Sequence, residues 1–437
     1  MLSRFVLGFA TVCFTVSAWA AKEIVFFGGG GEPQGPTTIF DAAYANFAPF
    51  KPDSGWSVRS YFDGGHSTSQ AIADQMFPGK NKSMTTKNVS QEVANLKARI
   101  QRGELKSGDQ VMITLATHGL KKSASQSTHN VATVDGSFNV DELKQLRDLA
   151  EKKGVSLAIV DFSCYSGNSL NLGTDKTCVI SAAGDSLAYN TTGHSMSTQF
   201  KKGVTLEEAF LKGRQVVNPA APQISSEAGR KAYELTKVLT ESMKERSAIA
   251  TAQDMGANCY GTSSSPYRKL SGQLKDIQRS IGMVEYLKVQ LGLAEDKIKP
   301  MIDRLEGAVK KYANSRNEVQ KTFDELKALD KEQCYEMGIK MCGNFDNWTY
   351  GHKVLKDLQT KRALSAAEKT ELALYEGVLK RPEYQRWSAL KKKFDTHNSL
   401  WDEANDVAAA ERDIYKLLYD HFSKQSTKPN PCRSFVL

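Results

Sequence analysis

Two apolar segments of the chain lead into residues that can do nucleophilic chemistry. Val111–Ala116 leads into His118, and Leu157–Val160 leads into Cys164. A cysteine attacks as a thiolate, and a nearby histidine can take the thiol proton and later return it to a leaving amine. If the two segments are adjacent parallel strands, an imidazole and a thiol emerge side by side at the carboxyl end of a sheet. His118 and Cys164 are therefore the candidate catalytic pair.

Backbone N–H groups beside this pair are candidates for holding an oxyanion. A carbonyl oxygen becomes negative when sulfur attacks its carbon, and losing one fixed donor costs on the order of 10²–10³ in turnover. The N–H groups of Gly119 and Cys164 are the natural donors, because glycine lets the backbone approach a substrate closely. The alternative is a core cysteine and a satisfied histidine in a domain without catalysis.

Apolar runs alternate with helical patterns between residue 22 and about residue 225. The patterns predict strands over 23–27, 56–62, 111–116, 157–161 and 177–182, and helices over 37–47, 89–100, 141–152 and 206–215. This alternation implies a mainly parallel sheet covered by helices on both faces, whose ligands bind beyond the carboxyl ends of the strands. Gly28–Gly31 is interpreted as a turn at a strand end, because it lacks the spacing of a phosphate-binding loop.

The second half of the sequence has a different texture. From about residue 227 strand signals vanish and lysine and glutamate become frequent. Apolar residues step by three and four over 270–291, 298–309 and 414–418, which is typical of packed amphipathic helices. We therefore expect an α/β domain at 22–226 and an all-α domain at 227–437.

The amino terminus resembles a cleavable export signal over residues 1–20. Arg4 precedes an apolar stretch at 5–16, and Ala18–Trp19–Ala20 supplies the small residues of a cleavage site. We expect an exported protein, periplasmic or secreted, rather than one held by a membrane anchor. No later apolar run approaches the roughly 20 residues that span a bilayer, so no membrane span is expected.

Export makes disulfides possible, and six cysteines follow the signal. Cys178 lies in an apolar run and is expected to be a buried core residue. The four cysteines of the second half allow three pairings. Of these we favour Cys334 with Cys342 and Cys259 with Cys432.

The net charge of +9 has two interpretations: attraction to acidic polymers of the cell envelope, and a solvated lysine-rich surface. Export and the lack of a basic motif with interleaved aromatic residues argue against nucleic acid as a partner. No group of His, Asp or Glu has metal-ligand spacing, so neither a metal nor a cofactor is expected. His66, His129 and His194 lie in polar loops. His129 and His194 could border the site, but we expect these histidines at the surface.

Residues 22–225 resemble the caspase-like domain of clan CD cysteine peptidases, a group that includes caspases, metacaspases, legumains, gingipains and clostripain. His118–Gly119 resembles the His-Gly block of these enzymes, and Asp161–Gly167 resembles the nucleophile segment of metacaspases. Val179–Ala183 resembles the strand after the nucleophile, and Pro222–Ile224 resembles a closing Pro-Gln segment. Caspases place the histidine about 50 residues before the cysteine, which is similar to the spacing here.

The resemblance implies a three-layer α/β/α domain and a cysteine endopeptidase that acts on polypeptides through a thioester. In metacaspases the acid two residues before the cysteine helps to form a pocket for basic side chains. Here Asp161 lies three residues before Cys164, and Phe162 takes the nearer place. Asp185 is the alternative, because legumain- and clostripain-like enzymes place specificity residues in that region, although a solvated turn aspartate fits equally.

Two other functions remain open from the residues alone. The first is an inactive caspase-like scaffold whose helical half binds a protein or envelope partner. The second is a legumain-like transpeptidase, which joins peptides through the same acyl-enzyme. Water access to the thioester separates that activity from hydrolysis.

Overall fold

The computed structural model of the protein describes residues 20–32, 35–50, 55–184, 188, 190–216, 221–247, 283–336, 355–397 and 400–437. The chain divides into two compact units. The first comprises Met1–Gly213, Pro222–Ser226 and Thr427–Leu437. The second comprises Arg214–Ala221 and Glu227–Ser426.

The first unit is built on a seven-stranded sheet with the strand order β10-β9-β8-β4-β1-β2-β3. Its strands are β1 (Lys22–Gly28), β2 (Trp56–Phe62), β3 (Asn81–Lys82), β4 (Gln110–Ala116), β8 (Ser156–Asp161), β9 (Thr177–Ser181) and β10 (Gln223–Ile224). Every neighbouring pair is parallel except β10 with β9. The two continuously apolar runs, β4 and β8, are adjacent strands in the interior of the sheet. Such strands are buried on both faces, which is why they carry apolar side chains on both faces.

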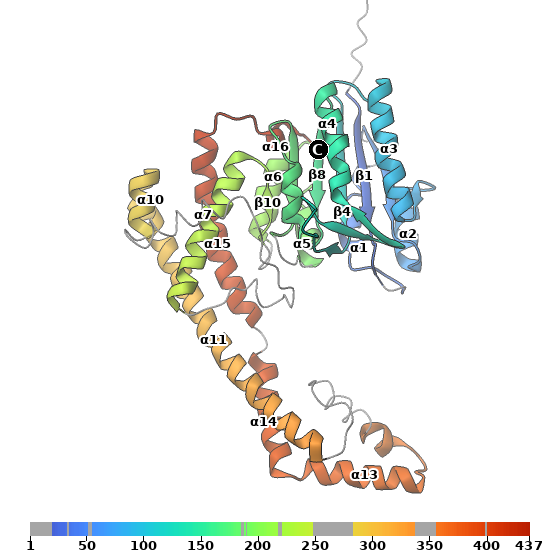
Figure 1. Ribbon diagram of the computed structural model, residues 1–437, viewed down its shortest axis with the longest axis vertical. Coiled ribbons are helices and arrows are strands. Elements are labelled where there is room, and N and C mark those ends of the chain that lie inside the picture. Colours follow the sequence, from blue (N-terminus) through green and yellow to red (C-terminus); the bar gives the residue numbers. More distant parts are fainter. Residues whose placement is uncertain are drawn as a thin grey trace, which may run out of the picture. The chain divides into compact units, whose positions relative to one another are not determined.

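Helices cover both faces of this sheet (Figure 1). On one face, Val25 and Phe27 of β1 share a core with residues of α3 (Thr86–Arg102) and α4 (Leu143–Lys153). On the other face, the ring of Phe26 lies 4.8 Å from that of Tyr44 in α1 (Asp41–Ala45). The layer of α1 also includes α2 (Ser67–Met76) and α5 (Asn190–Ser197), which contact it, and the chain continues into α6 (Leu206–Val216). The predicted three-layer domain with a mainly parallel sheet is confirmed.

A small antiparallel sheet, not predicted from the sequence, begins directly after His118. It has the order β5-β6-β7 and consists of β5 (Gly119–Leu120), β6 (Asn130–Thr133) and β7 (Gly136–Asn139). The N–H of Ala132 in β6 donates to the His118 carbonyl at 2.8 Å. The small sheet therefore holds the backbone of the histidine. Short 3-10 helices follow β7 and the cysteine loop: η2 (Val140–Glu142) and η3 (Ser166–Leu172).

The second unit is helical, as predicted. Its helices are α7 (Glu227–Ser247), α10 (Met283–Leu291), α11 (Glu295–Glu336), α13 (Ala366–Leu379), α14 (Pro382–His397) and α15 (Leu400–Gln425). α15 packs against α7 and α11, and α14 packs against α11. The stepping pattern at 298–309 supplies the buried face of α11, where Leu305 and Val309 are almost fully buried.

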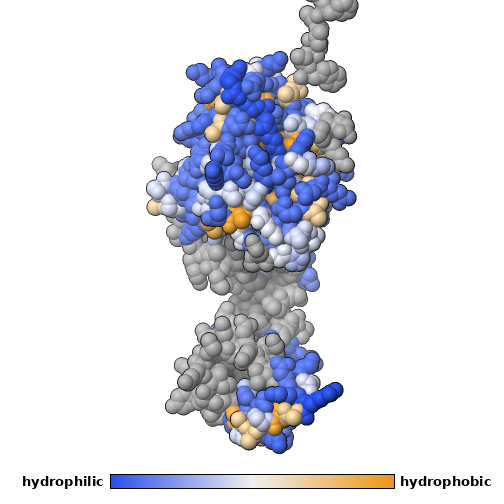
Figure 2. Space-filling model, turned by 90° about the vertical axis from the view of Figure 1, so that its right-hand side faces the viewer, coloured by the Kyte–Doolittle hydropathy of each residue, from blue (hydrophilic) through white to orange (hydrophobic). Residues whose placement is uncertain are grey.

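The face drawn in Figure 2 is covered mostly by hydrophilic residues, and apolar side chains form small separate patches. None of the helices within the described part of the chain is long and apolar enough to cross a membrane.

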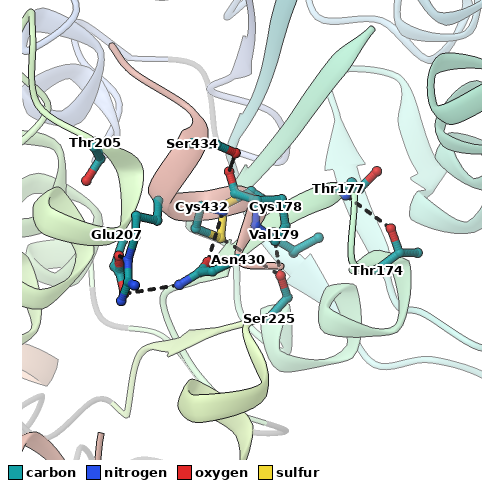
Figure 3. Close-up of a disulfide and its surroundings, with 12 residues drawn as sticks. Thr174, Thr177, Cys178, Val179, Thr205, Glu207, Ser225, Asn430, Cys432 and Ser434 are labelled. Carbon is teal, nitrogen blue, oxygen red and sulfur yellow. Dashed lines mark hydrogen bonds and ion pairs between the residues drawn. A yellow bond between two sulfur atoms is a disulfide. The ribbon is translucent and has the colours of Figure 1, made fainter. Parts of the chain in front are cut away.

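The end of the chain returns to the first unit and is held there by a disulfide (Figure 3). Cys432 in α16 (Pro431–Ser434) bonds to Cys178 in β9, and both residues are buried. Arg433 and Asn430 contact the carboxylate of Glu207 at 2.6 and 3.1 Å. The last eleven residues are therefore part of the α/β unit and not of the helical one that precedes them.

This pairing corrects two expectations. The predicted bond between Cys259 and Cys432 is wrong, because α16 places Cys432 beside β9 and its partner is Cys178. Cys178 is buried, as expected, but it is a disulfide cysteine. Cys259 and Cys342 lie outside the described residues, and so does the side chain of Cys334, although its backbone belongs to α11.

We expect loss of this bond to destabilise the first unit. The bond closes a loop with a sequence separation of 254 residues, and removing a native disulfide typically costs about 2–4 kcal/mol. The double variant Cys178→Ser/Cys432→Ser should unfold at a lower urea concentration than the wild type, and reductant should lower the midpoint of the wild type more than that of the double variant. Cys164→Ser, which leaves the bond intact, is the control. Identical midpoints for the control and the double variant would contradict this prediction.

Candidate functional site

The pairing of β4 with β8 brings the histidine and cysteine segments together. The two strands run in parallel, and the last paired residues are Leu115 and Asp161. His118 and Cys164 follow these strand ends directly, so both lie at the carboxyl edge of the sheet. A Cβ added to Gly119 would lie 1.8 Å from the carbonyl oxygen of Cys164. The backbone of Gly119 thus lies against the backbone of Cys164, and any residue with a Cβ at position 119 would clash with it.

The imidazole of His118 has two neighbours that restrict it. Its Nε2 lies 2.5 Å from Oε1 of Glu32, and the ring of Phe40 packs against it edge-on with a centroid distance of 5.2 Å. The His118 side chain is 38% exposed, whereas that of Glu32 is only 12% exposed. The ring is therefore held on one side by a carboxylate while part of it stays accessible to a substrate.

The glycine run after β1 carries Glu32 to this position. Gly29 and Gly31 have positive φ values of 74° and 78°, a region that favours glycine. A Cβ at Gly30 would lie 2.1 Å from the carbonyl oxygen of Ala132. The run expected to be a simple turn thus presses against β6, and side chains larger than hydrogen would push it away.

Cys164 lies at the start of a sharp turn. The residue is half-buried, its Sγ is 3.6 Å from the carbonyl oxygen of Ala188, and it belongs to no disulfide of the described residues. Tyr165, next in the chain, has φ 61° and ψ 13°, a left-handed conformation that is strained for a bulky residue. Asn168 holds the turn, because its backbone N–H and its Nδ2 both donate to the Tyr165 carbonyl, at 3.0 and 2.9 Å.

A cluster of buried polar side chains is hydrogen-bonded to the cysteine segment. Asp161 is fully buried, and its carboxylate accepts hydrogen bonds from Ser163 at 2.6 Å and Ser169 at 2.5 Å. His129, also fully buried, places Nε2 2.8 Å from the Ser163 hydroxyl and 3.4 Å from Asp161 Oδ2. Burial lowers the pKa of His129, and the nearby Asp161 and Asp141 carboxylates oppose this shift. Burial therefore favours the neutral ring over the imidazolium.

These placements change the roles expected of several residues. Asp161 points into the interior and is occupied by serine hydroxyls, so it does not line a substrate pocket as expected. Asp185 lies outside the described residues. His194 is exposed as predicted, but His129 and His66 are buried, contrary to expectation.

Sequence reasoning missed Glu32 and the cluster of His129 and Ser163. Glu32 reaches His118 only through the folded glycine loop, and nothing in its local sequence marks it apart from the glycines before it. Ser163 lies inside the segment that resembles the metacaspase nucleophile, but its partner His129 comes from the residue directly before β6. Among the described residues, no group of His, Cys, Asp and Glu has an arrangement that could hold a metal ion.

No protein-family model matches the chain, and no curated protein matches its sequence. Among solved structures, the chain is similar to a secreted C11 cysteine protease from Bacteroides thetaiotaomicron, solved in complex with an irreversible peptide inhibitor. The identity is 10%, the TM-score is 0.24, and the match covers 52% of this chain and 70% of that chain. Function is therefore argued from the site itself.

The contact between Gly119 and Cys164 predicts a severe effect of one methyl group. Gly119→Ala should lower the free energy of unfolding by about 1–3 kcal/mol or more, because the added Cβ forces the two segments apart. Gly307→Ala is the matched control, since an added Cβ there meets nothing within 4 Å. Chemical denaturation measures both. A Gly119→Ala protein as stable as the control would show that the contact is absent in solution.

The buried His129 predicts a loss of stability in acid. Its pKa is lowered in the folded protein, so the unfolded chain binds a proton near its ordinary value of about 6.5 while the folded chain does not. The free energy of unfolding should therefore fall as pH drops below about 6.5, by up to about 1.4 kcal/mol per pH unit for this group. Urea unfolding from pH 7.5 to 5 measures the slope. His129→Gln should flatten it, whereas the exposed His194→Gln should not; equal slopes would refute the assignment.

Proposed function

We propose that the protein is an exported cysteine endopeptidase whose reacting groups are Cys164 and His118. The observation that carries this proposal is the contact of Gly119 with the backbone of Cys164, at the carboxyl ends of two adjacent parallel strands. A thiol and an imidazole that arise from these two segments share one edge of the sheet. That edge is where open parallel sheets bind their ligands.

The proposed reaction runs through an acyl-enzyme. His118 takes the proton of the Cys164 thiol, and the sulfur attacks the carbonyl carbon of a peptide bond. The N–H groups of Gly119 and Cys164 donate to the oxyanion. His118 then gives its proton to the departing amine, which leaves a thioester. Water, activated by the same imidazole, hydrolyses the thioester and restores the thiol.

The choice of peptide bond depends on fewer residues than expected. A preference for basic side chains rested on Asp161 or Asp185, and the complete burial of Asp161 removes the first of them. We therefore propose that any such preference comes from Asp185 or its neighbours. For the helical unit we propose a binding role toward a protein or envelope partner.

A fluorogenic peptide library tests the peptidase proposal. The mature wild-type protein should cleave a subset of peptides, and both Cys164→Ala and His118→Ala should lower turnover by about 10³-fold or more. Glu104→Ala, which removes an exposed carboxylate paired with Arg102, is the control and should leave turnover unchanged. Equal signals from the wild type and Cys164→Ala would rule out this function and favour an inactive scaffold. Products longer than the substrate would instead identify a transpeptidase.

A further inference from the structure

We propose that Glu32 is a positioning residue for His118. Its carboxylate accepts a hydrogen bond from the N–H of Nε2 and so leaves Nδ1 as the nitrogen that takes the proton of Cys164. This inference rests on the proposed function, because it assigns a third residue to the same site.

The pairing of Glu32 with His118 is close and specific. Nε2 and Oε1 are 2.5 Å apart, and the carboxylate is only 12% exposed. Within the part of the chain that the structure describes, His118 is the only basic side chain that pairs with Glu32. A carboxylate that is mostly removed from water needs a hydrogen-bonding partner, and here that partner is the imidazole.

The backbone fixes Glu32 before any substrate binds. β1 and β4 are adjacent parallel strands, and their last paired residues are Gly28 and Ala116. Beyond them, the N–H of Gly29 donates to the Ala116 carbonyl at 3.0 Å, and the Thr117 hydroxyl donates to the Gly30 carbonyl at 2.9 Å. The loop that carries Glu32 is thus bonded to the segment that carries His118. These bonds keep the backbone of Glu32 close to that of His118.

A carboxylate in this place selects one of two tautomers. A neutral imidazole carries its proton on either Nδ1 or Nε2, and a hydrogen-bond acceptor at Nε2 keeps the proton there. Nδ1 then keeps its lone pair, and the edge-on ring of Phe40 restricts reorientation of the imidazole. In serine proteases, changing the orienting carboxylate to an amide leaves the geometry intact but lowers kcat about 10⁴-fold, because the wrong tautomer forms.

The alkylation rate of Cys164 by iodoacetamide tests this role without any peptide substrate. In the full-length protein at pH 7, peptide mapping by mass spectrometry follows this one thiol. Glu32→Gln has nearly the shape of glutamate but can donate to Nε2, so it should lower the alkylation rate by about 10-fold or more. A merely structural Glu32 would let Glu32→Gln react at the wild-type rate, and that result would overturn the proposal. Glu104→Gln is the control and should react like the wild type.

Two further variants separate the possible failures. His118→Ala should also react slowly; if it is slow while Glu32→Gln reacts normally, the role of Glu32 fails and the catalytic pair stands. If both react at the wild-type rate, the pair and the role of Glu32 fail together. Should Glu32→Gln not fold, Glu32→Ala decides: formate, a small carboxylate, should restore part of its alkylation rate. Equal rates in formate and in chloride would overturn the proposal.

Discussion

The backbone hydrogen bonds between β4 and β8 determine where every group of the site lies. They end at Leu115 and Asp161, so the chain leaves both strands at the same edge and the segments that follow must pass close to each other. The approach is so close that a Cβ on Gly119 would overlap the Cys164 carbonyl. A shift of one residue in this register would turn each side chain of the strand to the other face. The register of the sheet therefore determines where the side chains of the site lie.

The polar groups around this edge form two sets, one that contacts the histidine and one that supports the cysteine segment. In the first set, the glycine loop brings Glu32 to Nε2 of His118. In the second set, Asp161 is fully buried and accepts hydrogen bonds from Ser163 and Ser169. A buried carboxylate is costly unless its oxygens are bonded, and these hydroxyls satisfy that need while fixing the residue before the thiol. The acid that the sequence suggested for substrate recognition thus serves the shape of the cysteine segment instead.

The sequence contained the parts of the fold that depend on local patterns. Continuous apolar runs identified β4 and β8, and the stepping of leucines identified the helices. Contacts between single side chains that are far apart in the sequence could not be predicted from it. Cys432 bonds to Cys178 because the chain returns to β9 after the whole helical unit. No local sequence pattern predicts that return. Glu32 meets His118 because β1 lies beside β4, an order of strands that the sequence leaves open.

The strand β8 is held between two neighbours, and each neighbour is secured in a different way. On one side β4 is joined to the loop after β1 by the bonds of Gly29 and Thr117. On the other side β9 carries the disulfide to α16, and the chain that follows β9 supplies Ala188, whose carbonyl faces the thiol of Cys164. Noncovalent contacts thus secure the histidine flank, and a covalent bond secures the flank that leads to the thiol. Because the bond joins residues on either side of the helical unit in sequence, it would keep the end of the chain attached to the sheet if that unit were cut.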